Sequence, residues 1–168
     1  MKKFNFPRIA RNMLSTHSQL KRVFPSNSLD AIERAIKQCE ANHTGEIRFV
    51  IETALDCAAL FAEQTTRERA IEVFSKVGVW DTEHNNGVLI YVLLADREVE
   101  IIADRGIYRK TGIDAWSQIC HQIEEAFKQG LFEEGVIQGI RAVGQHLSTH
   151  YPASGQKINE LPDKPVLL

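Results

Sequence analysis

The sequence predicts one three-layer α/β/α sandwich with a small mixed central sheet that includes a hairpin. A continuous apolar run at Gly87–Ala95 is typical of a strand that helices cover on both faces. Alternating apolar residues at 46–53 indicate a second strand, and apolar residues at helical spacing on either side indicate the covering layers. With 168 residues, 43 % of them hydrophobic, the chain can bury one core but is too short for two comfortable domains.

The first half of the domain is predicted as helix, strand, helix. The first helix begins at Asn27 or Ser28, either of which can cap it, and ends near Asn42–Gly45. Its apolar residues share one face: Leu29, Ile32, Ile36 and Cys39. A strand at 46–53 follows. A capping box, Thr65 with Glu68, then opens a helix that stops at Gly78.

The buried strand at 87–95 is predicted to turn back at Asp96-Arg97 into a third strand, Glu98–Ala103. A two-residue turn would pair Ala95 with Glu98, Leu89 with Asp104 and Gly87 with Gly106. The loop entering the hairpin, 80–87, and the loop leaving it, 104–110, must then lie side by side. These loops are the most polar and functional-looking stretches of the chain.

Two helices are predicted to close the domain. The first follows Thr111 or Gly112 and ends at Gly130, and the second runs from Phe132 to about Leu147. The second contains three glycines despite their cost in a helix, which indicates that its backbone approaches a neighbour closely: Gly135, Gly139 and Gly144.

A basic arm at 1–25 precedes the α/β domain at 26–151, and an extended tail follows at 152–168. Up to residue 29 the chain carries no acidic side chain and six basic ones: Lys2, Lys3, Arg8, Arg11, Lys21 and Arg22. The arm also carries apolar residues: Phe4, Phe6, Ile9, Met13 and Leu14. Two interpretations stay open. The arm lies on an anionic membrane surface, or it packs on the domain through its aromatic residues.

Composition excludes several classes of protein. The net charge of −2 combines +6 over residues 1–29 with −8 over the rest, and an acidic body argues against nucleic-acid binding. Three widely spaced cysteines, Cys39, Cys57 and Cys120, argue against a disulfide framework. No apolar run approaches the ~20 residues of a membrane span, and the first residues lack the apolar stretch of a signal peptide. Together these observations predict a cytoplasmic protein.

The two adjacent loops carry the candidate site. Oxygen ligands from Asp81, Asn85, Asn86 and Asp104 suit a hard cation such as Ca²⁺ or Mg²⁺, whereas Arg105 suits an anion or phosphate. The alternative is purely structural, because Asn-Asn-Gly and Asp-Arg-Gly are turn-forming sequences. Motifs of the P-loop, the Gly-x-Ser-x-Gly elbow and the cysteine phosphatases are absent. Hydrolysis would therefore need a metal, and no organic cofactor is predicted.

Several segments in this order resemble TPM-domain proteins, the family also called TPM phosphatase: 44–50, 85–91, 95–101, 104–107 and 127–135. The resemblance covers roughly residues 28–150. It implies an α/β sandwich, with acid phosphatase activity, calcium binding or an accessory role in assembling membrane complexes. It also implies a LemA-type protein as a partner. Asn86 stands where the family usually has an acidic residue, and Tyr108 where it usually has Glu.

The sequence is therefore compatible with two functions. The first is an accessory interaction module for a protein partner, with a weak Ca²⁺ or Mg²⁺ site at the two loops. The second is a metal-assisted acid phosphatase in which Asp81, Asn86 and Asp104 hold the metal. In the phosphatase, His84 would donate a proton and Arg105 would neutralise the phosphate.

Overall fold

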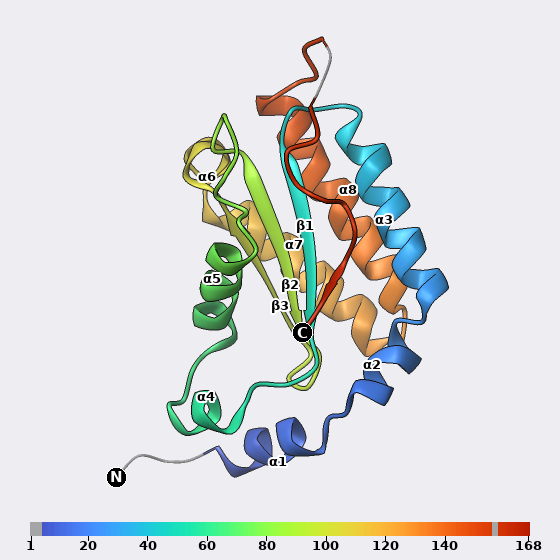
Figure 1. Ribbon diagram of the computed structural model, residues 1–168, viewed down its shortest axis with the longest axis vertical. Coiled ribbons are helices and arrows are strands. Elements are labelled where there is room, and N and C mark those ends of the chain that lie inside the picture. The colour runs from blue at the N-terminus through green and yellow to red at the C-terminus, as the bar shows by residue number, and fades with distance from the viewer. Residues whose placement is uncertain (1–4, 156–157) are drawn as a thin grey trace.

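The computed structural model describes residues 5–155 and 158–168, which form a four-stranded sheet between two helical layers (Figure 1). Lys2, Lys3 and Phe4 of the predicted arm lie outside the described residues. The strand order is β3-β2-β1-β4. The strands are β1 (Glu46–Glu52), β2 (Gly87–Leu93), β3 (Glu98–Ala103) and β4 (Val166–Leu167). Because β1 runs parallel to β2 and β4 while β3 runs antiparallel to β2, the sheet is mixed, as predicted.

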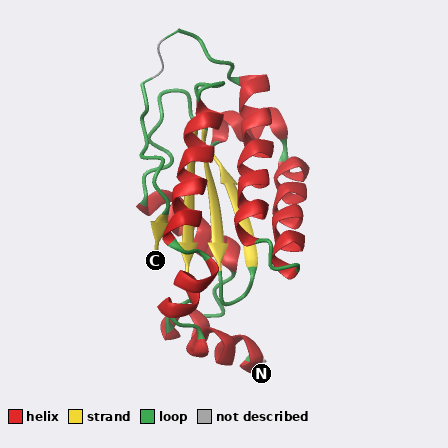
Figure 2. Cartoon of the chain, turned by 90° about the vertical axis from the view of Figure 1, so that its right-hand side faces the viewer, coloured by secondary structure: helices red, strands yellow, loops and turns green. Residues whose placement is uncertain are grey.

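The helical layers differ in size (Figures 1 and 2). The larger layer holds α3 (Ser26–Glu40), α7 (Ile113–Lys128) and α8 (Phe132–His150). The opposite face is covered by α5 (Thr66–Lys76), with α4 (Cys57–Phe61) below it. Three further short helices are α1 (Phe6–Leu14), α2 (His17–Val23) and α6 (Arg105–Thr111). The predicted three-layer α/β/α class is confirmed.

The central strands explain the apolar runs of the sequence. Every residue of β1 and β2 is buried, because each face of the sheet packs on its own helical layer. Phe49 and Ile51 of β1 point into the core under α3, α7 and α8, whereas Val50 between them points into the core under α5. This alternation is the period of two that an extended strand imposes.

The predicted hairpin is correct in its two strands but wrong in its register, which differs by two residues. Leu93 pairs with Glu98, so the loop has four residues, 94–97, and Leu89 faces Ile102 rather than Asp104. The backbone N–H groups of Leu94 and Ala95 are drawn away from the hairpin, to the carbonyls of Glu52 (2.9 Å) and Thr53 (3.1 Å). Arg97 closes the loop with a positive φ of 56°.

One further prediction needs correction, one gains a detail, and one is confirmed. Most of the stretch predicted as a loop at 104–110 is helix α6, for which Asp104 is the N-cap. The predicted tail contributes β4, a strand that the sequence pattern did not indicate. The close approach predicted from the glycines of α8 is confirmed, because a Cβ at Gly144 would overlap the Cys39 Sγ.

The basic arm contributes to the main core. Leu20 of α2 and Phe24 after it are fully buried, and Phe24 packs edge-on against three aromatic rings, those of Phe49, Phe127 and Phe132. Phe6 is instead exposed. Over the described ranges, no helix combines the length and apolar character that crossing a bilayer requires.

Candidate functional site

The predicted contact between the two polar loops exists at the end of the sheet where β2 begins. The Asp104 N–H donates to the Gly87 carbonyl at 2.9 Å, and α6 starts directly after it. The first turn of α6 then meets the loop 80–87, because the Asn85 carbonyl accepts the N–H groups of Gly106 (2.9 Å) and Ile107 (3.3 Å). The loop thus satisfies amides that a helix start leaves open.

Local backbone conformation makes this approach possible. Asn85 has a positive φ of 51°, a conformation that asparagine tolerates better than most residues. A Cβ at position 106 would overlap the backbone carbonyls of His84 and Asn85, so this close contact requires the glycine of Asp-Arg-Gly. The glycine serves packing between the two segments and not a turn.

The predicted ligand residues have different surroundings. The Asn85 Oδ1 accepts from the Arg105 Nε at 3.1 Å, and one Asp104 oxygen accepts from the Arg105 N–H at 2.6 Å. Asn86 is fully buried, and its amide nitrogen donates to the Thr44 Oγ1 at 3.4 Å. The Asn86 Oδ1 and the Asp104 Oδ2 are buried without a hydrogen-bond partner in residues 5–155 and 158–168.

Asp81 and His84 are exposed, and the hydrogen bonds of this end do not bring them together with Asp104. Within the described part of the chain, no three His, Cys, Asp or Glu side chains are grouped to hold a metal ion. A cation here would depend on amide oxygens and on the two buried oxygens of Asn86 and Asp104. Their donor chemistry suits Ca²⁺ or Mg²⁺, while the nearby Arg105 guanidinium opposes a divalent charge.

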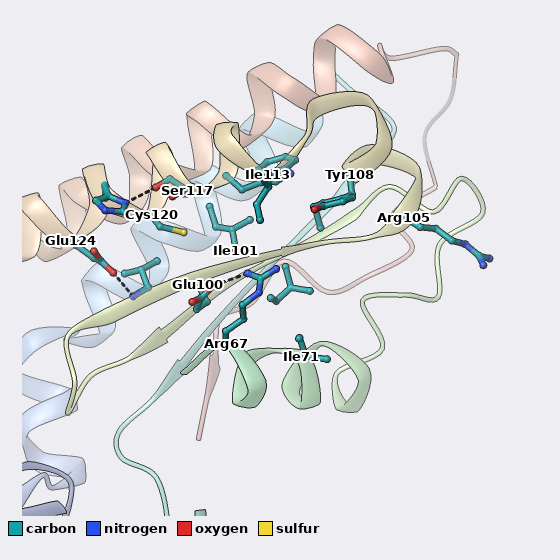
Figure 3. Close-up of a pocket in the computed structure, with 15 residues that line it drawn as sticks. Arg67, Ile71, Glu100, Ile101, Arg105, Tyr108, Ile113, Ser117, Cys120 and Glu124 are labelled. Carbon is teal, nitrogen blue, oxygen red and sulfur yellow. Dashed lines mark hydrogen bonds and ion pairs between the residues drawn. The ribbon is translucent and has the colours of Figure 1, made fainter. Parts of the chain in front are cut away.

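A groove that sequence reasoning missed runs along β3, next to this end (Figure 3). Its cavity measures about 570 Å³. The floor comes from Val99 to Ala103, and the walls come from α5 and from α6 and α7. Three large apolar side chains of the lining are exposed, one from each helix: Ile71, Tyr108 and Ile113. Arg105 also lines the groove, with its guanidinium pointing away from the other lining residues, so the groove and the loop end adjoin (Figure 3).

The floor is an edge strand, since β3 is the last strand of the sheet order. The Val99 N–H points away from β2 and donates to a Glu124 carboxylate oxygen at 3.0 Å. By the alternation of an antiparallel pair, the N–H groups of Ile101 and Ala103 point the same way. The sequence does contain a sign of this edge, because residues 98–103 form the last strand of the predicted hairpin and no further strand is predicted beside them.

The groove is acidic along part of its length. Glu100 pairs with Arg67 at 3.0 Å. Burial raises the pKa of Glu100; Arg67 opposes this shift, and the Glu98 and Glu124 carboxylates add to it. Burial also raises the pKa of the Cys120 thiol to about 12, which makes this lining thiol a poor nucleophile.

Comparisons with known proteins identify relatives of this fold. A family model described as the TPM domain matches residues 18–146. The solution structure of the BA42 protein from the psychrophilic bacterium Bizionia argentinensis is 32 % identical, with a TM-score of 0.76, and the match covers 86 % of this chain and 95 % of that chain. The N-terminal domain of a P. gingivalis protein is 19 % identical, with a TM-score of 0.55 and coverage of 73 % and 76 %, and shares the fold. A comparison with curated proteins finds no match.

Proposed function

The chain belongs to the TPM domain family, and from this premise we propose that it is an interaction module that binds an extended segment of a protein partner in the β3 groove. The main support for this proposal is the rim of the groove, where three helices expose apolar side chains beside an edge strand: Ile71, Tyr108 and Ile113. Exposed apolar patches mark binding surfaces, and edge strands accept added strands through their outward backbone groups. Two of those groups on β3 are already engaged, the Val99 N–H by Glu124 and the Ile101 N–H by the Cys120 thiol, so a segment that adds as a strand would displace these contacts. A LemA-type protein is the partner class that the family resemblance suggests.

The charges of the groove specify the segment. Its apolar side chains would alternate, so that every second one meets the rim, because an extended chain has a period of two. A lysine or arginine of the segment would lie opposite Glu100 and Glu124. Among the described residues, Arg67 is the one basic side chain that pairs with these carboxylates, so a further positive charge would be favourable there. No disulfide joins the three cysteines in the described part of the chain, which is consistent with the reducing conditions of the cytoplasm, where we place the protein.

Selection from a displayed library of random decapeptides tests this function. We expect enrichment of peptides with alternating apolar residues and one basic residue. Ile71→Glu should weaken their binding by about tenfold or more, because it puts a charge on the apolar rim. Leu131→Glu is the matched control, since Leu131 is 45 % exposed against 48 % for Ile71 and lies outside the groove. Equal binding by the two variants, or no enrichment, would contradict the proposal.

The loop end is proposed as a weak Ca²⁺ or Mg²⁺ site beside this groove. Support comes from the two buried oxygens that have no partner among the described residues, on Asn86 and Asp104. Cation titration followed by amide chemical shifts should move signals in 81–87 and 104–110, with dissociation constants of about a millimolar.

Asp104→Asn tests the cation site most directly, because asparagine also caps a helix but lacks the negative charge of aspartate. It should weaken cation binding while leaving α6 folded. Asp114→Asn, at an exposed acid in the first turn of α7, is the control and should leave binding unchanged. Flat spectra for the unmodified protein at millimolar cation would remove the site.

The alternative function is a metal-assisted acid phosphatase. Arg105 favours it, because its bond to Asn85 engages the Nε, and over the described residues no other hydrogen bond holds the guanidinium. The exposed Nη groups can take two oxygens of a phosphate, with the exposed His84 as proton donor. Hydrolysis of p-nitrophenyl phosphate, dependent on metal and lost in Arg105→Gln, would support this alternative. Hydrolysis that survives Arg105→Gln would indicate a contaminant.

A further inference from the structure

Helix α1 is attached to the protein by polar contacts and by Ile9, which packs on the smaller core. The Arg8 Nε pairs with the Asp96 Oδ2 at 2.7 Å, and the Asn12 amide donates to the Asp96 Oδ1 at 2.9 Å. The Asn12 Oδ1 in turn accepts the Leu55 N–H at 2.9 Å. The Asp96 side chain is 1 % exposed, so these bonds form a buried polar anchor. The anchor fixes which side of α1 turns outward.

The outward side of α1 is apolar. Phe6, Met13 and Leu14 are 73 %, 67 % and 75 % exposed, and Ala10 between them is exposed as well. Residues 6, 10, 13 and 14 share one side of a helix, because successive residues turn by about 100°. An ordinary surface helix turns its apolar side to the core, whereas in α1 Ile9 packs inward and these four apolar side chains face outward.

Three arginines lie beside the Leu14 end of the exposed apolar side. A cavity of about 440 Å³ beside α1 is lined by Leu14 and by Arg11, Arg22 and Arg97, which come from α1, α2 and the β2–β3 loop. The acid in this lining is Asp96, whose two oxygens are already engaged by Arg8, Arg11 and Asn12. The cavity therefore offers positive charge to an anion.

We propose that α1 docks the protein on an anionic lipid surface. Phe6, Met13 and Leu14 enter the boundary between headgroups and acyl chains, and Arg11, Arg22 and Arg97 meet the lipid phosphates. Apolar side chains flanked by basic ones are the pattern of helices that lie in this interface. Each basic residue near an anionic leaflet adds to the attraction, and the segment 1–29 carries no acid to oppose it.

A lipid surface explains the charges better than a second copy of the chain does. A symmetric dimer through α1 would bring the arginines of one copy against the same arginines of the other. Burying like charges in an interface is costly, whereas an anionic surface compensates them. This proposal stands independently of the groove and of the cation site, because it shares no residue with either.

Vesicle co-sedimentation of the full chain is the test. Vesicles of phosphatidylcholine with phosphatidylserine should bind the protein about tenfold or more tightly than phosphatidylcholine alone, and added salt should weaken binding. Met13→Gln with Leu14→Gln should reduce binding about tenfold or more. Arg22→Gln with Arg97→Asn should abolish the preference for phosphatidylserine, and asparagine accommodates the positive φ at 97.

Matched controls separate docking from general effects. Ile158→Gln removes an exposed apolar side chain elsewhere, and Lys76→Gln with Lys128→Gln removes two exposed positive charges elsewhere. Both should bind as the unmodified protein does, and circular dichroism melts should be alike for all variants. Binding without preference for phosphatidylserine, or unchanged by the α1 variants, would overturn the proposal. So would a lipid-free dimer that Met13→Gln with Leu14→Gln dissociates.

Discussion

Glu52, at the end of β1, is a buried carboxylate whose partners come from a helix and a neighbouring strand. Arg69 of α5 holds it with two bonds, from Nε (2.9 Å) and Nη2 (2.8 Å). The Tyr91 hydroxyl of β2 donates to the same carboxylate at 2.6 Å. Burial, and then this bond to Glu52, raises the pKa of Tyr91. The three side chains form one hydrogen-bonded network inside the smaller core, and the loss of any one member would deprive another of a hydrogen-bond partner.

Arg69→Met should lower the free energy of unfolding by about 3 kcal/mol, because it leaves the Glu52 carboxylate buried without its cation. Urea denaturation measures this change. Arg67→Met is the control, because Arg67 is more exposed in its pair with Glu100, and it should cost about 1 kcal/mol or less. A loss below 1 kcal/mol for Arg69→Met would mean that Tyr91 and water satisfy Glu52 adequately.

At the scale of elements, the hairpin separates what the sequence could predict from what it could not. The side-by-side placement of 80–87 and 104–110 was predictable, because any short hairpin brings its outer ends together. The register was not, because the loop length depends on contacts remote in sequence, such as the pairing of Asp96 with Arg8. The sequence Asp-Arg-Gly predicts a turn at Gly106, whereas the structure needs this glycine for contact with a loop about twenty residues earlier. The groove stayed hidden because it requires the strand order.

The packing of α8 on α7 should make the stability of the protein depend on pH. The His146 ring lies 5.4 Å from the Trp116 ring, and burial, then the charge of His150, lowers the pKa of His146. The unfolded chain, with a histidine pKa of about 6.5, therefore takes up the proton more readily. The free energy of unfolding should fall as the pH drops from about 7 through the pKa of folded His146.

His146→Gln should flatten this dependence, as followed by urea denaturation across the same pH range. His121→Gln, at an exposed histidine of α7, is the matched control and should leave the slope as it is. A slope that both variants share with the unmodified protein would assign the acid sensitivity to other groups.

For the whole molecule, the arm joins the body through two different kinds of contact. The segment around α2 inserts Leu20 and Phe24 into the main core, while α1 is held by the polar anchor on Asp96 and by Ile9 against the smaller core. The last residues also return to the body, where β4 pairs with the central strand β1. Both ends of the described chain are therefore tied to the same sheet and core.

Phe24→Ala should destabilise the whole fold by about 3–5 kcal/mol, because it removes a ring packed among three others. Chemical denaturation should show one transition, with the arm and the body unfolding together. Phe6→Ala, at an exposed ring of the same arm, should change stability by about 0.5 kcal/mol or less. A separate early transition for Phe24→Ala would mean that the arm unfolds alone.

The β2–β3 loop and the start of β2 lie at opposite ends of the sheet, and this makes the strands a spacer. Asp96 anchors α1 at one end of the sheet. Gly87 lies at the other end, where it begins β2, a strand of seven residues. At about 3.3 Å per residue, the loop end would stand roughly 20 Å above a docked bilayer. That height exceeds twice the Debye length of about 8 Å at physiological salt. Residues 81–87 would therefore sample bulk ion concentrations, and their Ca²⁺ affinity should not change with lipid charge.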